Sequence, residues 1–258
     1  MKSNLLKYAI LSAFALTTVF SSCKKDEDDD QPTPTTGSLS FELTHKVGSD
    51  PLVQNTVTYV NLDGDSFIVT KFRYYISNVV LKKADGSTYA PSECYYLVDD
   101  SVSSSKTFTI SDIPVGEYTS MTFLLGVDST RNCSGAQSGA LDALNGMFWS
   151  WNNGYIFLKL EGMSSSASGG MFMYHVGGFK GTTNAIRTIA PDFNGDVVDM
   201  RAGKTSTIHM VANLAELFAN PTTIDIGTLS MIHMPSAEAV TLADNYADMF
   251  RVDHIHND

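Results

Sequence analysis

The chain has 258 residues, with 17 basic and 28 acidic side chains and a formal net charge of −11. This acidic balance excludes a nucleic-acid partner, because neutralising phosphates requires clustered Lys and Arg. The chain has only three cysteines, too few for a disulfide framework. Cys94 and Cys133 could still form one bond in an oxidising compartment.

The first 22 residues have the pattern of a secretory signal. Two lysines precede an apolar stretch at residues 8–20, which is shorter than the roughly 20 residues of a transmembrane helix. Small residues then lead to Cys23, an arrangement that resembles a bacterial lipobox. We therefore expect residues 1–22 to be removed and Cys23 to be acylated, which would anchor the protein in a membrane. No later stretch approaches membrane-spanning length, so the rest is expected to be soluble.

Residues 23–38 are expected to form a tether. An acidic run follows Cys23 and cannot bury itself, and a Pro/Thr-rich spacer comes next. An acidic run in this place resembles the export signal of Bacteroidetes lipoproteins. It indicates an outer-membrane lipoprotein exposed on the cell surface, with the periplasmic face as the other option. Residues 39–258 are long enough for one domain with a full core.

The body of the chain predicts mainly strands. The first of them, residues 39–45, alternates apolar and polar side chains, which is the period of a half-buried strand. Strand-like runs are predicted at residues 39–45, 67–81, 95–98, 107–110, 118–125, 155–160, 171–176 and 205–211.

Helix is scarce in the prediction. A turn or two is expected at residues 141–144, a short helix at 212–219, and a helix at 237–250 capped by Ser236. Many short strands separated by turns favour an all-β fold. We predict a β-sandwich of antiparallel strands with short helical segments, one of them near the C-terminus.

Enzyme motifs are lacking in this sequence. It has no nucleophile elbow, no Walker loop, no dinucleotide-binding glycine motif and no zinc-protease motif. We therefore expect a protein that is not an enzyme.

Candidate soft metal ligands are present instead. Met171, Met173 and His175 share one face of a predicted strand. Imidazole and thioether are ligands that Cu(I) prefers, although methionines at strand spacing also fill cores. His45 ends the apolar face of the first strand, where a ligand and a core histidine are equally compatible with the pattern. His209 shares its face with Thr205 and Thr207, which indicates a surface histidine.

The last histidines, His254 and His256, lie on one face if the terminus is extended. His233 has no informative neighbours, so its role stays open.

Both tryptophans of the chain, Trp149 and Trp151, precede a Gly-Tyr pair, and a His-x-Gly motif begins at His175. Together with the segments at residues 72–79 and 116–127, this combination resembles the copper-binding MbnP-like family. The likeness extends from about residue 39 to the C-terminus.

The resemblance implies a secreted β-sandwich that holds one Cu(I). It also implies oxidation of the first tryptophan of the pair to kynurenine by a partner dihaem enzyme of the cytochrome c peroxidase type. Carried onto this sequence, Trp149 would be the modified residue and His175 would be a ligand. Trp151 would lie beside Trp149. From their strand spacing with His175, we also expect Met171 and Met173 to line the site.

This chain departs from the family pattern at one ligand position. Many members carry a Leu-Asn-His segment, where this chain has Arg131-Asn132-Cys133. Either His45 or the pair His254 and His256 replaces the missing histidine, or this branch keeps the fold and has lost the metal.

Two functions of different class follow. The first is a cell-envelope lipoprotein that binds Cu(I) for capture, buffering or homeostasis. The second is a surface β-sandwich that binds a glycan or a protein without metal, with Trp149, Trp151 and Tyr155 as a stacking platform.

Overall fold

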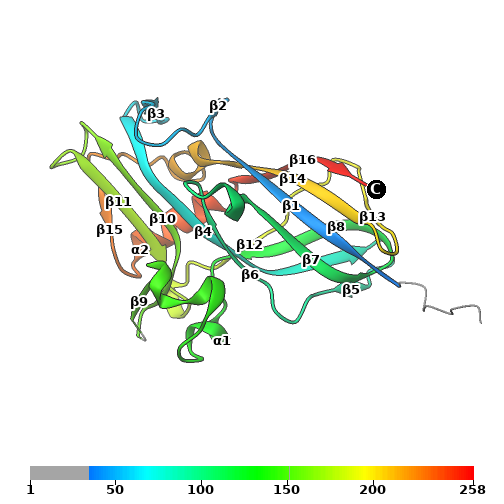
Figure 1. Ribbon diagram of the computed structural model, residues 1–258. Helices are drawn as coiled ribbons and strands as arrows, with labels where there is room; N and C mark the ends of the chain where they lie inside the picture. The colour runs from blue at the N-terminus through cyan, green and yellow to red at the C-terminus, as the bar shows by residue number, and fades with distance from the viewer. Residues whose placement is uncertain (1–34, 151) are drawn as a thin grey trace, which may run out of the picture. The chain divides into compact units, whose positions relative to one another are not determined.

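The computed structural model describes residues 35–150 and 152–258, which form mainly strands in two sheets (Figure 1). Cys23, the predicted signal, most of the tether and Trp151 lie outside the described residues. The smaller sheet consists, in spatial order, of β16 (Phe250–His256), β14 (Thr205–Asn213), β1 (Thr36–Val47) and β2 (Asp50–Pro51), with β7 (Thr107–Pro114) also paired to β1.

The larger sheet is built around the long strand β4. Its main path is β12 (Arg187–Ile189), β8 (Gly116–Leu125), β4 (Ser66–Lys83), β10 (Gly154–Ser164), β11 (Met171–Gly177) and β15 (Met231–Ile232). Shorter strands are added at its edges: β13 (Val198–Met200) on β8, β9 (Phe148–Ser150) on β10, and β3 (Tyr59–Val60), β5 (Thr88–Tyr89) and β6 (Tyr95–Asp99) on β4. The pairs β1–β14 and β11–β15 are parallel, and the other pairs are antiparallel.

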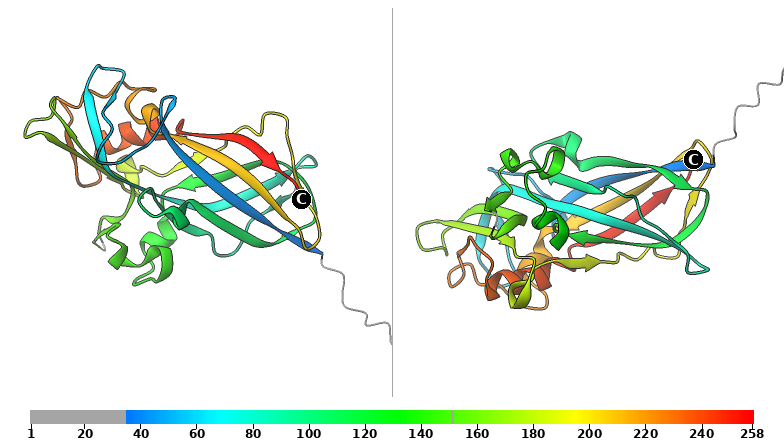
Figure 2. Two further views of the ribbon diagram at one scale, coloured as in Figure 1. Left: turned by 45° about the horizontal axis from the view of Figure 1, so that its top comes forward. Right: turned by 90° about the horizontal axis from the view of Figure 1, so that it is seen from below.

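The two sheets pack face to face through aromatic side chains, as Figure 2 shows from two further sides. Phe250 of the smaller sheet meets Tyr74 and Phe123 of the larger one, each at a ring-centroid distance of 5.3 Å. In β1 the predicted alternation is present, since Phe41 is buried and Glu42 is exposed. The predicted β-sandwich is therefore confirmed, because each sheet buries one face against the other.

Helical segments are short. The two α-helices are α1 (Ser129–Asn132) and α2 (Ala237–Tyr246), and the 3₁₀ turns are Ser103–Lys106, Gly139–Leu141, Ala143–Asn145, Gly181–Thr183 and Leu214–Phe218. Ser236 caps α2, as predicted, by accepting a hydrogen bond from the Ala239 N–H at 3.2 Å. Among the described residues, no helix has the length and apolarity needed to span a bilayer.

The eight predicted strands are all present, and the main error concerns the C-terminus. The helix predicted at residues 237–250 ends at Tyr246, and Phe250 begins the unpredicted strand β16. Pairing of β16 with β14 places the Phe250 side chain between the two sheets, where it contacts Tyr74, and this burial favours a strand over a longer helix. Similarly, the helix predicted at 212–219 is a 3₁₀ turn, because Ala212 and Asn213 still belong to β14.

A buried amide connects α1 to the start of β10. Asn132 is 2% exposed, and its Oδ1 accepts a hydrogen bond from the Tyr155 N–H at 2.9 Å. Its Nδ2 donates to the carbonyl oxygens of Val127 at 2.7 Å and Asp128 at 3.0 Å. These bonds join the first residues of β10 to α1.

We predict that Asn132→Ala lowers the free energy of unfolding by at least about 2 kcal/mol, because it leaves buried backbone groups without partners. Chemical denaturation followed by circular dichroism measures the change. Asn152→Ala, at an exposed position in the following turn, is the control and should cost little. Equal stability of the two variants would contradict this role of Asn132.

Candidate metal centre

Trp149 packs on the strand that carries His175. Trp149 lies in the short strand β9, and its six-membered ring faces Gly177 of β11. A Cβ atom built on Gly177 would lie 2.8 Å from Cζ3 of Trp149, so only glycine leaves room for the indole. Since alternate residues share one face of a strand, Trp149 lies over the face that His175 occupies two residues earlier.

Tyr155, the third aromatic residue of the predicted stacking platform, belongs to the core. Its side chain is only 3% exposed, and its hydroxyl donates to the carbonyl oxygen of Leu141 at 2.7 Å. The ring packs edge-on against Phe148 at 5.0 Å. Trp149 is half-buried, so the described part of the chain does not present both rings as one flat surface.

His175 has one ring nitrogen engaged and one available. Its Nε2 lies 2.8 Å from Oε1 of Glu161, and Oε2 of Glu161 lies 3.1 Å from the Lys71 Nζ. Because a carboxylate only accepts, Nε2 carries the proton and Nδ1 keeps its lone pair. No hydrogen bond joins this Nδ1 to another described residue.

Electrostatics keep His175 neutral. Burial lowers the pKa of His175, and the nearby cation of Lys159 lowers it further, against the opposing effect of Glu161. Burial raises the pKa of Glu161, but its hydrogen bonds with His175 and Lys71 outweigh burial and leave it below the usual value. A neutral imidazole oriented by a carboxylate is the usual form of a metal-binding histidine.

Methionines lie along the strand face that carries His175, on the outer side of the larger sheet. The register places Met163 of β10 opposite Met171 of β11, and Met173 of β11 beside Met231 of β15. Three of them are unusually exposed for methionine, at 44% for Met163, 68% for Met171 and 59% for Met231. We call the set Met163, Met171, Met173 and Met231 the methionine face.

The sequence pattern identified only part of the methionine face. Met171 and Met173 were recognised from strand spacing, whereas Met163 and Met231 join them through pairing between distant segments. His233 follows β15 directly and is exposed.

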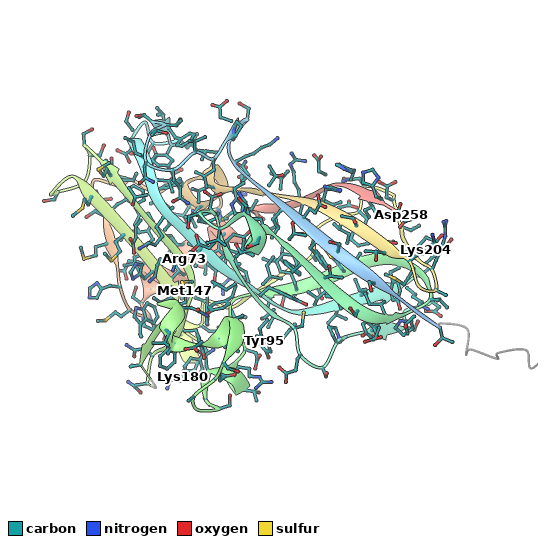
Figure 3. All side chains as sticks on the ribbon, viewed as in Figure 1. Arg73, Tyr95, Met147, Lys180, Lys204 and Asp258 are labelled. Carbon is teal, nitrogen blue, oxygen red and sulfur yellow. The ribbon has the colours of Figure 1, made fainter. Side chains whose placement is uncertain are left out.

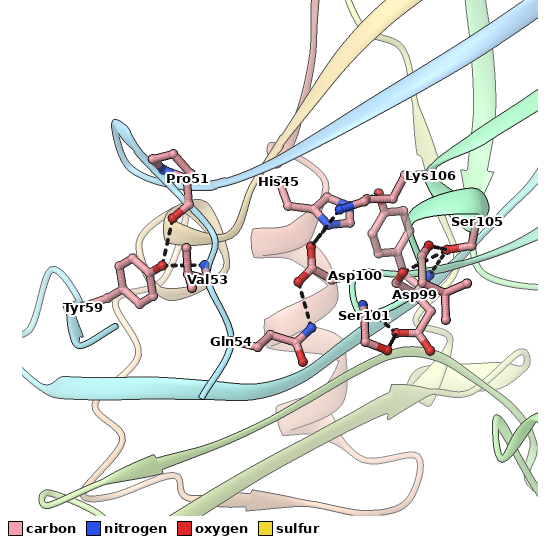
Figure 4. A network of polar contacts seen from close by, with 12 residues as sticks. His45, Pro51, Val53, Gln54, Tyr59, Asp99, Asp100, Ser101, Ser105 and Lys106 are labelled. Atoms are coloured by element: carbon pink, nitrogen blue, oxygen red, sulfur yellow. Dashed lines mark hydrogen bonds and ion pairs between the residues drawn. The ribbon is translucent and has the colours of Figure 1, made fainter. Parts of the chain in front are cut away.

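His45 is fully engaged inside the sandwich. Its Nδ1 lies 2.7 Å from Asp100 Oδ1 (Figure 4). Its Nε2 lies 2.9 Å from the Tyr74 hydroxyl, so Nε2 accepts when Nδ1 donates. Gln54 donates to the second oxygen of Asp100 at 2.8 Å. With both nitrogens occupied and the residue 5% exposed, His45 has no lone pair to offer a metal.

His254 and His256 lie beside His209, which the sequence pattern predicted to be a surface histidine without a role in metal binding. His209 stacks on His254 at a ring-centroid distance of 4.1 Å and lies 5.2 Å from His256. Ligand nitrogens of these three side chains lie within 4.8 Å of one another. His209 is therefore part of a cluster with His254 and His256, and the cluster contains neither His45 nor His175.

The histidine cluster and the methionine face lie at different ends of the described domain. In Figure 1, β11 and β15 lie at the left of the view, and β16 runs to the C-terminus at the right. Figure 3 labels Asp258, two residues after His256, at this second end. His175 thus lies apart from both alternatives for the missing ligand, His45 and the pair His254 and His256. Cys94 is buried and Cys133 is exposed, and both are free thiols.

Comparisons with known proteins agree with this architecture. The MbnP family model matches residues 36–235. Among solved structures, MbnP from Methylosinus trichosporium superposes with a TM-score of 0.50 and 13% identity, covering 79% of this chain and 86% of that one. No curated protein sequence matches the chain. The family model spans most of the described residues, and the chain therefore belongs to the MbnP family.

Proposed function

We propose that this protein is a cell-envelope lipoprotein that binds Cu(I) at the methionine face, next to Trp149, for copper capture, buffering or homeostasis. The observation that carries the proposal is the position of Trp149, whose ring covers Gly177 on the strand face that bears His175 and Met173. Membership of the MbnP family supports it.

The donor atoms around His175 suit Cu(I). His175 offers Nδ1 through a neutral imidazole, while Glu161 holds the opposite nitrogen and fixes the ring. Met173 supplies a thioether two residues away on the same face, and Met231 a second one on the neighbouring strand. Imidazole and thioether favour Cu(I), and thioethers persist in an oxidising compartment.

Oxidation of Trp149 to kynurenine would add a further donor to this site. Insertion of dioxygen atoms into the indole C2–C3 bond, followed by hydrolysis that releases formate, leaves an aryl amine where the indole had only an N–H. The oxidant would come from a partner dihaem enzyme of the cytochrome c peroxidase type. The partial exposure of Trp149 leaves part of its ring accessible to such a partner.

The proposed location rests on the N-terminal sequence. Acylated Cys23 would anchor the chain in the outer membrane, and the acidic tether would carry the domain away from the surface. The binding role needs no turnover, so we propose that the protein is not an enzyme.

We predict that His175→Ala weakens Cu(I) binding more than the about 10–100-fold typical of losing a supporting contact, because it removes a direct ligand. The measurement is a competition titration with a Cu(I) chelator. The parent protein and the His175→Ala variant both also carry His209→Ala, His254→Ala and His256→Ala, so that the distant histidines do not contribute to the measured affinity.

A matched pair of methionine variants extends this titration. Met173→Leu removes a thioether from the methionine face and should also weaken binding, whereas Met210→Leu in the core should not. If His175→Ala and Met173→Leu both bind Cu(I) as tightly as their parent, the methionine face is not the copper site, and the glycan- or protein-binding reading gains.

For Trp149 we expect protein from the native cell to contain kynurenine. The conversion gains one oxygen and loses one carbon, a net increase of about 4 Da that peptide mass spectrometry resolves. Protein made in a host without the dihaem partner should retain the indole and bind Cu(I) more weakly. An unmodified Trp149 in native material would rule out the modification.

For the anchor, Cys23→Ala should move the protein from the membrane fraction to the soluble fraction, because the acylated thiol is lost. Cys133→Ala, which removes an exposed free thiol of the domain, is the control and should leave the protein in the membrane fraction. Immunoblots of fractionated cells measure both. Unchanged membrane association of Cys23→Ala would contradict lipid anchoring.

A further inference from the structure

We infer that His209, His254 and His256 form a second metal site, separate from the methionine face and specific for a divalent first-row ion such as Cu²⁺ or Zn²⁺. The site goes beyond the proposed Cu(I) function and does not depend on it. We call these three residues the histidine triad.

Strand pairing creates the histidine triad. The antiparallel register sets His209 of β14 directly opposite His254 of β16, and it sets His256 opposite Thr207. His209 points to the outer face, because the buried residue Ile208 precedes it in β14. His254 and His256 pair with His209 and Thr207 and therefore lie on the same face of β16. A register shift after His209 keeps both Asp253 and His254 exposed. Residues separated by more than 40 positions thus meet in one patch.

Carboxylates orient two of the three imidazoles. Glu42 of β1 lies beside His209 in the parallel register, and its Oε2 is 3.2 Å from the Nδ1 of His209. Asp253 Oδ2 is 3.0 Å from the Nδ1 of His254. Asp253 accepts the Nδ1 proton of His254 and leaves the Nε2 lone pair of that ring free. Glu42 lies within ion-pair distance of the His209 ring. A neighbouring carboxylate of this kind usually accompanies a ligating histidine.

The spacing of the histidine triad fits a small ion. Its ligand nitrogens lie within 4.8 Å of one another. Bonds of about 2.1 Å to a tetrahedral ion would separate them by about 3.4 Å. To bind one ion, the stacked rings of His209 and His254 therefore have to turn out of their parallel arrangement, which their exposure permits. His254 is 47% exposed and His209 is 27% exposed, and β16 is an edge strand, which leaves these rings accessible from solvent.

The donor set selects a different ion from the methionine face. Three imidazoles without a thioether or thiolate suit Cu²⁺ and Zn²⁺, with Cu²⁺ bound more tightly. A fourth position would remain for water. In addition, the family model ends at residue 235, so His254 and His256 lie beyond the matched segment. Two of the three residues of the histidine triad therefore come from β16, outside that segment, and the third comes from β14.

The test is isothermal titration of the full chain, purified in detergent, with zinc chloride, because Zn²⁺ has no redox chemistry. Wild type should bind one zinc ion through the histidine triad. His209→Ala and His256→Ala should each weaken binding more than the about 10–100-fold typical of supporting contacts, and Glu42→Gln should weaken it by about 10-fold. His233→Ala, an exposed histidine outside the triad, is the matched control and should bind like wild type.

A second readout uses Cu²⁺ and electron paramagnetic resonance. The wild-type spectrum should show coupling to imidazole nitrogens, and His209→Ala should change it. Circular dichroism confirms that each variant is folded. Absence of zinc binding by wild type, or equal affinity in wild type and His209→Ala, would overturn the proposal. The Cu(I) titration of His175→Ala tests only the methionine face. The zinc titration can therefore refute the histidine triad without refuting the Cu(I) site, and the reverse also holds.

Discussion

The backbone of β4 is the constraint on which the rest of the structure depends. This strand is 18 residues long, and every described strand of the larger sheet either pairs with it or is connected to it through β8 or β10. Its first half pairs with β10, and its second half pairs with β8, with a register irregularity between Ser77 and Val80. Asn78 adopts a positive φ of 51° there. The irregularity accompanies the change of partner, since a bulge bends a strand and increases its twist.

This arrangement separates two kinds of surface. At the β10 end, β11 and β15 extend the larger sheet (Figure 1), and the methionine face lies on their outer side, away from the buried residues that alternate with it. The smaller sheet has its own free edge at β16, where the histidine triad lies. A sandwich buries one face of each sheet, and its outer faces and edges remain for ligands. The two candidate sites occupy these remaining surfaces.

Histidine shows how surroundings decide the role of a side chain. His45, His175 and His209 each face a carboxylate, through Asp100, Glu161 and Glu42. Only His45 also meets a buried hydroxyl, from Tyr74, and this contact occupies its second nitrogen. The other two keep one nitrogen free and lie at the surface or close to it. The difference between a structural histidine and a candidate ligand is thus a single hydrogen bond.

By itself, the sequence determined the local structure and the family. Apolar alternation is a short-range property, so residues 39–45 and 171–176 were recognisable as strands, and the Trp149 and His175 motifs indicated the MbnP family. The sequence did not reveal which histidines meet, because the register between β14 and β16 depends on Phe250 reaching the core beside Tyr74. The local sequence around a solvent-facing residue such as His209 is the same whether or not its neighbour on the next strand is a histidine. Only the tertiary structure decided that, because strand pairing over long sequence separations places residues that no local pattern connects.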